Sequence, residues 1–487
     1  MDKRTHVRAL LSAVLLLPAG TGLAQVPQAP AAQAAPAVQQ ATSPAERQFR
    51  AWLATFNAGD RVAYEAFIRE QSPSRAARID NDMSMFAVTG GFDLRKVESA
   101  TATAVTCLVQ ERAWEQVARA AVEVEAAPPH RITRLALNLV PRPADMVVRR
   151  LTAPELAPAV RAKVNRQAAD GRFQGAVLVA RRGTVIYSDA KGLADREVGT
   201  PNTLETRFRM GSMNKMFTAT AIMQLVQAGR IKLEAPLGTY LAGYPNRDVA
   251  TKVTIHHLLT HTGGTGDIFG PQFAEHRLEL RTLDDYVKLY GARGLEFEPG
   301  ARWQYSNYGF LLLGVIVQKV SGQTYYDYVR DHIFKPAGMD GSGSEPEDVQ
   351  VPGRAKGYMQ EKGAWVLNTG TLPYRGTSAG GGYTTVPDLL RFAAALMNHK
   401  LLDAANTTLM TSGKVDTPGG GKYAYGFAED MEGGVRSFGH SGGAPGMNGD
   451  LRIFPDSGYV VAALANTGSG AAQVVSWVSE RLPVAAR

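Results

Sequence analysis

Strand-like segments near both ends of residues 155–487 constrain the fold more than any other feature of the sequence. Two strands are expected at Gln174–Arg181 and Thr184–Ala190, joined by a turn. Residues 230–420 are helical and loop-rich, so one antiparallel sheet must collect strands from both ends around an inserted all-helical lobe. A cleft between lobe and sheet is the expected place for a site. The remaining strands are expected at Tyr423–Glu429, Gly434–Phe438, Gly449–Phe454 and Gly458–Asn466, and the flanking helices at Glu155–Ala169 and Ala471–Leu482.

Residues 44–146 have a different pattern and predict a small α+β domain. Helices are expected at Ala45–Asn57, which is amphipathic, and at Val62–Glu70. Strand-like runs follow at Phe92–Ala100, Ala102–Gln110, Trp114–Glu125 and Arg131–Val140. This order of elements loosely resembles the cone-shaped fold named for nuclear transport factor two. The segment contains no catalytic constellation, so a gating, dimerising or purely structural role stays open, and residues 155–487 are expected to fold without it.

The first 24 residues have the pattern of a secretory signal peptide. Lys3, Arg4 and Arg8 precede the apolar run Ala9–Pro18, and Gly22-Leu23-Ala24 supplies small residues at a cleavage site. The apolar run is too short to span a bilayer. Residues 25–43 are rich in Ala, Pro and Gln, which is typical of a linker. We therefore expect an exported protein, periplasmic or secreted, without a membrane span.

Charge and cysteine content exclude some classes of protein. The net charge of +8 is modest for 487 residues and no dense Lys/Arg run is present, so a nucleic-acid partner is not expected. Cys107 is the only cysteine, so no intramolecular disulfide can form. It lies in a predicted strand, where a buried apolar role is favoured over a reactive thiol.

Ser212 and Lys215 form the first candidate catalytic pair. The residues after Ser212 have helical periodicity, and positions three apart lie on one side of a helix, so the lysine amine can reach the hydroxyl. The start of a helix also favours a developing oxyanion. The same Ser-x-x-Lys pattern occurs at Ser188–Lys191, but that segment is predicted to be a strand that runs into a turn. Context therefore selects Ser212 as the activated nucleophile.

Two further segments supply partners for this pair. Tyr305 and Asn307 alternate in a short extended piece, so both can point into one space, and a phenol can relay a proton if a cation lies nearby. Tyr244 and Asn246 repeat the pattern in a Pro-containing loop. Beside a predicted strand, backbone N–H groups of a glycine-rich segment can complete an oxyanion hole. Its residues are His440, Ser441, Gly442 and Gly443.

His256, His257 and His261 lie close together in the sequence. The spacing of His257 and His261 is that of a helical zinc pair, but no Glu follows His257 and no third ligand is evident. Capping and packing are the favoured roles. Neither a metal nor another cofactor is expected.

In the order Ser212-x-x-Lys215, Tyr305-x-Asn307 and His440-Ser441-Gly442, residues 155–485 resemble the serine β-lactamase and penicillin-binding-protein superfamily. The similarity is greatest to the class C β-lactamase-like group, with its esterases, D-amino acid peptidases and D-Ala-D-Ala carboxypeptidases. Supporting segments are Gly175–Val179, Thr254–Gly264 and Ala379–Leu389. The resemblance implies a β-lactamase/transpeptidase-like fold.

The resemblance also implies a role for each site residue. Ser212 would be acylated, Lys215 would sustain a proton network, and Tyr305 would be the general base. Asn307 would position the substrate or Lys215, and the N–H groups of Ser212 and Gly443 would form the oxyanion hole. His440 stands where β-lactamases and penicillin-binding proteins usually have a Lys that helps to hold the substrate carboxylate.

Because a histidine is mostly neutral at pH 7, this change favours the esterase and peptidase relatives. The expected function is an exported serine hydrolase that cleaves an ester or amide of a small-molecule or peptide substrate. Two alternatives stay open. One is a β-lactamase or D,D-carboxypeptidase that acts on cell-wall peptides, and the other is a catalytically silent binding or sensor module with the same fold.

Overall fold

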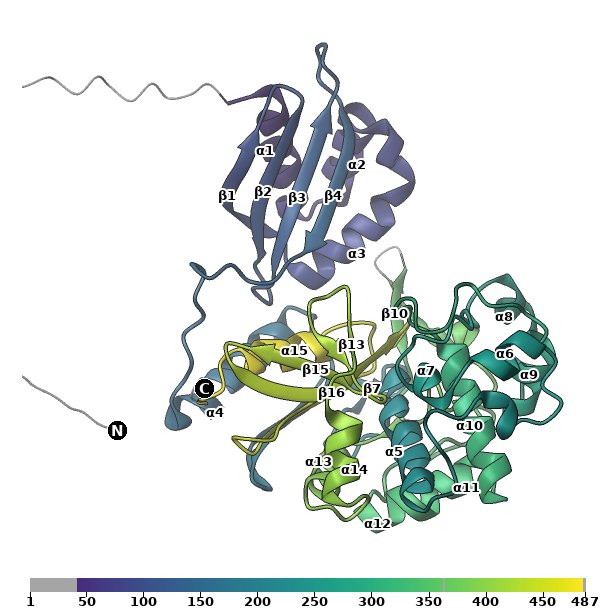
Figure 1. Ribbon diagram of the computed structural model, residues 1–487. Helices are drawn as coiled ribbons and strands as arrows, with labels where there is room; N and C mark the ends of the chain where they lie inside the picture. Colours follow the sequence, from purple (N-terminus) through teal and green to yellow (C-terminus); the bar gives the residue numbers. More distant parts are fainter. Residues whose placement is uncertain (1–41, 362–363, 485–487) are drawn as a thin grey trace, which may run out of the picture. The chain divides into compact units, whose positions relative to one another are not determined.

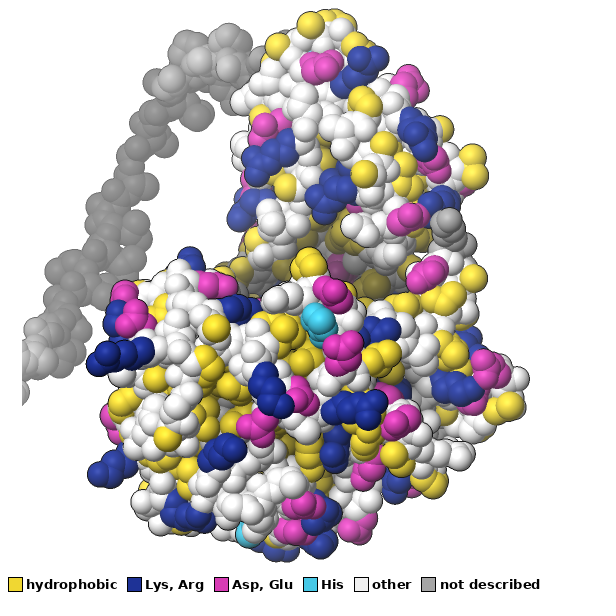
Figure 2. All heavy atoms as spheres, turned by 90° about the vertical axis from the view of Figure 1, so that its right-hand side faces the viewer, with side chains coloured by type: hydrophobic (Ala, Val, Ile, Leu, Met, Phe, Trp, Pro, Cys, Tyr) yellow, Lys and Arg dark blue, Asp and Glu magenta, His cyan; other side chains and the backbone are white. Residues whose placement is uncertain are grey.

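The computed structural model describes residues 42–361 and 364–484. The predicted signal peptide, residues 1–24, lies outside the described residues, as does the predicted linker up to residue 41. Across the described ranges, no helix is both long enough and apolar enough to cross a membrane. Lys/Arg and Asp/Glu side chains are interspersed over the face drawn in Figure 2.

The small domain has three helices on one face of a four-stranded antiparallel sheet (Figure 1). Ser43 caps α1, Pro44–Ala58, by accepting a hydrogen bond from the Glu46 N–H, and Gly59 ends it in a left-handed conformation. Cys107 is buried as expected, and burial raises the pKa of its thiol to about 12. The other elements are α2 (Arg61–Gln71), α3 (Ile79–Thr89), β1 (Phe92–Ala100), β2 (Ala104–Glu111), β3 (Val117–Val124) and β4 (Ile132–Leu139).

An eight-stranded antiparallel sheet forms the centre of the larger domain, in the order β13-β14-β15-β16-β17-β18-β5-β6. β18, from near the C-terminal end, pairs with β5, from near the start of the domain, so the two sets of strands meet as predicted. The strands are β5 (Gly175–Arg181), β6 (Thr184–Lys191), β13 (Val415–Asp416), β14 (Lys422–Tyr423), β15 (Ala428–Glu432), β16 (Val435–Ala444), β17 (Met447–Phe454) and β18 (Tyr459–Ala465).

Two layers of helices cover this sheet. α4 (Ala153–Ala169) and α15 (Ala471–Ser479) bury one core against it, and α5 (Asn214–Gln227), α10 (Asn307–Ser321) and the rest of the helical lobe share the larger core. The predicted arrangement of sheet, flanking helices and inserted lobe is confirmed. The other helices are α6 (Arg247–Lys252), α7 (Ile255–Leu259), α8 (Pro271–His276), α9 (Leu283–Tyr290), α11 (Tyr325–Val329), α12 (Lys335–Ala337), α13 (Val386–Met397) and α14 (Ala404–Thr411).

Short pieces complete the fold, among them a hairpin within the helical middle that the sequence did not predict. This hairpin pairs β10 (Tyr358–Glu361) with β11 (Ala364–Leu367). The other short strands are β7 (Leu193–Asp195), β8 (Thr200–Pro201), β9 (Phe208–Arg209) and β12 (Tyr383–Thr384), and a single 3-10 turn, η2 (Gly211–Met213), precedes α5.

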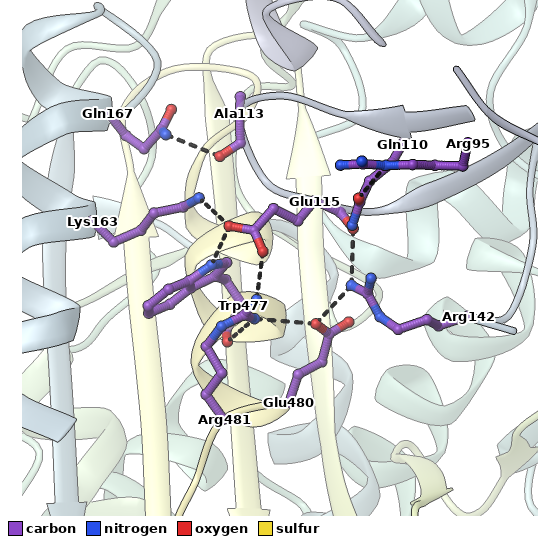
Figure 3. A network of polar contacts seen from close by, with 10 residues as sticks. All are labelled: Arg95, Gln110, Ala113, Glu115, Arg142, Lys163, Gln167, Trp477, Glu480 and Arg481. Atoms are coloured by element: carbon purple, nitrogen blue, oxygen red, sulfur yellow. Dashed lines mark hydrogen bonds and ion pairs between the residues drawn. The ribbon is translucent and has the colours of Figure 1, made fainter. Parts of the chain in front are cut away.

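The turn between β2 and β3 joins the small domain to the larger one. Ala113 and Trp114 are buried in the core that α4 and α15 form. Beside them the Glu115 carboxylate binds Lys163 and the Trp477 indole, each at 3.1 Å, and also Arg481 (Figure 3). Burial opposes ionisation of Glu115, but Arg481 and Lys163 outweigh it and hold its pKa below the ordinary value. This shared core was not expected from the sequence, and it argues against independent folding of residues 155–487.

Trp114→Ala should lower the free energy of unfolding by about 3–5 kcal/mol, because it empties a buried indole site. Denaturant unfolding of the full chain, followed by circular dichroism, measures this loss. Val147→Ala is the control, since Val147 is 83% exposed and its removal should change stability by less than about 0.5 kcal/mol. A loss below about 1 kcal/mol for Trp114→Ala would contradict a shared core.

Candidate active site

Ser212 lies in η2, and the first turn of α5 carries Lys215. α5 is buried on nearly all sides because its residues pack within the larger core, and Lys215 itself is 0% exposed. Its Nζ is 3.3 Å from the Ser212 Oγ, as the helical spacing predicted. In the other Ser-x-x-Lys segment, Lys191 lies on β6 and pairs with Asp189 at 2.9 Å.

Three oxygen atoms surround the Lys215 amine. Asn307 Oδ1 lies 2.7 Å from Nζ, the Ala379 carbonyl is also hydrogen-bonded to it, and Ser212 Oγ is the third. A carbonyl oxygen can only accept, so Asn307 and Ala379 take two N–H groups. In the neutral amine the lone pair is then left to face the Ser212 hydroxyl. Burial lowers the pKa of Lys215 to about 7 although Asp267 opposes the shift, so the neutral form is abundant near pH 7.

The ring of Tyr305 also lies against Lys215, with its centroid 4.6 Å from Nζ. Burial raises the pKa of its phenol well above the ordinary value, although a hydrogen bond with the Ser212 side chain acts in the opposite direction. The phenol is therefore protonated at neutral pH. The similar tyrosine at Tyr244 is elsewhere, because its hydroxyl bonds Tyr308 at 2.9 Å.

Asn307 is held in place by Asp267, a residue that belongs to none of the predicted motifs. The Asp267 carboxylate accepts hydrogen bonds from the Asn307 side-chain amide and backbone N–H, each at 3.2 Å. The amide nitrogen is thus directed to Asp267 and the amide oxygen to Lys215. Asp267 belongs to the loop Gly263–Phe273, which composition alone marks only as a loop.

The glycine-rich segment lies within β16 and passes directly beside Ser212. A Cβ atom on Gly442 would come within 2.0 Å of the Met210 carbonyl oxygen and 2.9 Å of the Ser212 nitrogen, so only glycine allows this approach. Gly443 follows it and lines the cavity next to Ser212. The segment thus brings its backbone to the position that an oxyanion hole requires.

His440 differs from its predicted place against the substrate. It is 5% exposed, its Nε2 is 2.9 Å from the Tyr423 hydroxyl, and its Nδ1 bonds the Ser441 carbonyl. Burial, followed by the charge of Lys215, lowers the pKa of His440 to about 3, so the ring is neutral. Neither the buried His440 nor the exposed Ser441 is among the described residues that line the cavity.

The cavity above Ser212 has a volume of about 110 Å³. No Lys, Arg, His, Asp or Glu is among the described residues that line it. Ser212, Asn307, Thr371 and Thr377 supply hydroxyl and amide groups near its floor and walls. Its apolar side is made of Ile268, Phe269, Phe273, Leu372, Pro373 and Met447.

The three histidines of the predicted cluster have separate partners. His257 completes a capping box with Thr254, and His256 bonds the Tyr425 hydroxyl at 2.8 Å. His261 lies behind Tyr305 and accepts from the Ser306 N–H. Within the part of the chain that the structure describes, no group of three or more His, Cys, Asp or Glu could hold a metal ion.

The known proteins that are similar to this chain match its larger domain. The family model described as Beta-lactamase matches residues 160–482. Penicillin-binding protein 4 of Amycolatopsis lactamdurans is 30% identical over 308 residues, 58% of this chain and 78% of that protein. Esterase EstB of Burkholderia gladioli is 35% identical over 219 residues, 42% of this chain and 56% of that protein. The crystal structure of a penicillin binding protein from Bacillus halodurans has 35% identity and a TM-score of 0.61, with 65% of this chain and 98% of that chain covered.

Proposed function

We propose that this chain, which belongs to the beta-lactamase family, cleaves esters or amides through a Ser212 acyl-enzyme and prefers substrates that are uncharged near the scissile bond. The chain is a serine hydrolase of that family. One observation carries the proposal: Ser212 contacts both Lys215 and Tyr305, and it lines a cavity in which the phenol of Tyr286 is the only ionisable side chain among the described lining residues.

The proposed acylation starts with the neutral Lys215 amine. It takes the Ser212 proton while Oγ attacks the substrate carbonyl, and the N–H groups of Ser212 and Gly443 stabilise the oxyanion. When the intermediate collapses, the Tyr305 phenol gives its proton to the leaving oxygen or nitrogen and is reprotonated from the Lys215 ammonium. Water then enters in place of the leaving group, and the same residues return Ser212 to its free form.

This assignment moves the base from Tyr305, which the family resemblance implies, to Lys215. A tyrosinate is costly in this buried position, whereas the amine with a pKa of about 7 loses its proton readily. Asn307 and Ala379 support the assignment because they leave the amine lone pair directed at Ser212.

The alternative of a cell-wall D,D-carboxypeptidase or a β-lactamase has less support. Such substrates carry a carboxylate, and the described residues that line the cavity include no Lys, Arg or His to bind one. His440 is buried and neutral, and Lys215 is buried next to Ser212. A catalytically silent module is also disfavoured, because contacts among Ser212, Lys215 and Tyr305 would serve no purpose in it.

Export belongs to the proposal as well. Its support is the charged and apolar pattern of residues 1–24. Mass spectrometry of the mature N-terminus tests it, with cleavage after Ala24 as the expected result. A chain that keeps Met1 in the cytoplasm would overturn it.

A matched pair of esters tests the preference for uncharged substrates. p-Nitrophenyl butyrate and p-nitrophenyl hemisuccinate have acyl groups of equal length, but the second ends in a carboxylate. We expect kcat/KM to be about 10–100-fold higher for the butyrate, because the apolar wall leaves the carboxylate unpaired. Equal rates would contradict the neutral-substrate proposal, whereas failure of fluorophosphonate to label the protein would contradict the serine hydrolase assignment itself.

A further inference from the structure

His261 occupies a backbone position that normally favours glycine. It follows the end of α7 with a φ of 60°, in the left-handed region. For a residue with a Cβ this conformation costs roughly 1–2 kcal/mol of conformational free energy, and helices commonly end on glycine for this reason. A bulky imidazole at such a place indicates that its side chain serves a purpose that offsets the cost.

The contacts of His261 lie on both sides of Tyr305. Its carbonyl oxygen accepts from the Gln304 N–H at 2.9 Å, and its Nδ1 accepts from the Ser306 N–H at 3.1 Å. The ring also lies against the Tyr305 ring, with centroids 4.4 Å apart. One residue therefore fixes the backbone before and after Tyr305 as well as the plane of its phenol.

The imidazole is uncharged and fully enclosed. Because Nδ1 accepts a hydrogen bond, the proton is on Nε2, which is buried and has no partner in the described part of the chain. Burial is the main cause that holds its pKa well below the ordinary value, and repulsion from the protonated forms of Lys215 and His440 adds to it. The ring also packs against Trp303, Phe310 and the Tyr423 phenol, and none of these brings a carboxylate to it.

We propose that His261 is a positioning residue for Tyr305: it holds the phenol where a proton can pass to the leaving group. This inference rests on the proposed acyl-enzyme function. It does not give His261 contact with substrate, because His261 is 1% exposed and is not among the residues that line the cavity. The motif Leu259-Thr260-His261 thereby gains a role that neither capping nor metal binding supplies.

Dependence on the leaving group tests this role. p-Nitrophenolate leaves with little help from an acid, whereas phenolate needs a proton in the transition state. His261→Phe keeps an aromatic ring next to Tyr305, but the Ser306 N–H loses its acceptor. The backbone directly after Tyr305 is then held less firmly. We expect kcat/KM to fall about tenfold or more for phenyl butyrate and less than about threefold for p-nitrophenyl butyrate, with KM little changed.

Two further variants separate positioning from folding. His261→Asn tolerates the left-handed backbone and places an acceptor oxygen near the Nδ1 position, so it should restore part of the loss for phenyl butyrate. His256→Phe makes the same change in a neighbouring histidine that bonds Tyr425. In this variant the ratio of kcat/KM for phenyl butyrate to that for p-nitrophenyl butyrate should not change. Active-site titration with fluorophosphonate normalises every rate to folded enzyme.

The outcomes are distinguishable. Equal losses on both esters in His261→Phe would overturn the positioning role, because a general loss of structure does not discriminate between leaving groups. If the wild-type protein does not react with fluorophosphonate at Ser212, the proposed function fails instead. A changed ratio together with an unchanged melting temperature supports the inference.

Discussion

Replacing Ser212 with alanine is expected to lower kcat/KM for p-nitrophenyl butyrate by about 10⁴–10⁶-fold, because the atom that forms the acyl bond is lost. The side chain is small and lines the cavity, so the fold should be retained. Stopped assays at high enzyme concentration measure the residual rate, and fluorophosphonate labelling should disappear in parallel.

Ser188→Ala is the matched control for this variant. Ser188 has a lysine three residues later, as Ser212 does, but it lies on β6, and Lys191 pairs with Asp189. The kcat/KM of Ser188→Ala should equal that of the wild type. Activity that survives Ser212→Ala but disappears in Ser188→Ala would move the nucleophile to β6 and overturn the site described above.

Lys215→Met should lower kcat/KM by about 10²–10⁴-fold, since the group that takes the Ser212 proton is removed while the apolar stem is kept. In the wild type, kcat/KM should fall as the pH drops below about 7, because the protonated amine cannot accept a proton. Any activity that remains in Lys215→Met should lack this acid limb. Lys191→Met is the control and should keep both the rate and the limb.

Lys215→Met should also raise the melting temperature, by an amount that depends on pH because burial lowers the pKa of Lys215. The pKa of Lys215 is about 7 in the folded protein and near 10.5 in the unfolded chain, so the unfolded state binds more protons between these values. Wild-type stability should rise with pH across this window. Lys215→Met removes the buried charge, so its gain in melting temperature should be largest below pH 7 and shrink above it. A gain that is constant with pH would mean that the pKa of Lys215 is the same in the folded and unfolded states.

The sequence predicted those parts of the site that depend on local spacing. A spacing of three residues on a helix brings Lys215 next to Ser212. Alternation in an extended segment brings both Tyr305 and Asn307 to the side that faces Lys215. The sheet could also be predicted, because buried strands leave continuous apolar runs. Asn307 reaches Lys215 across 92 residues, and the local spacing in either segment does not fix this contact.

The remaining features depend on tertiary contacts that leave no local pattern. His440 appeared exposed to substrate because glycines surround it, but Tyr423 from β14 accommodates its ring inside the protein. Asp267 belongs to a loop with no periodicity, and its partner Asn307 is 40 residues away. The sequence pattern predicted a strand that begins at Trp114. In the structure Trp114 belongs to a turn that packs against α4 and α15.

The turn that carries Trp114 and Glu115 has a consequence for the order in which the protein can be assembled during synthesis. Its partners Trp477 and Arg481 lie 362 and 366 residues after Glu115, so they leave the ribosome long after the turn does. The indole of Trp114 therefore lacks part of its native cover until α15 has been translated. A nascent chain stopped before Ala471 should bind chaperones that recognise apolar surface, and release of α15 should end that binding.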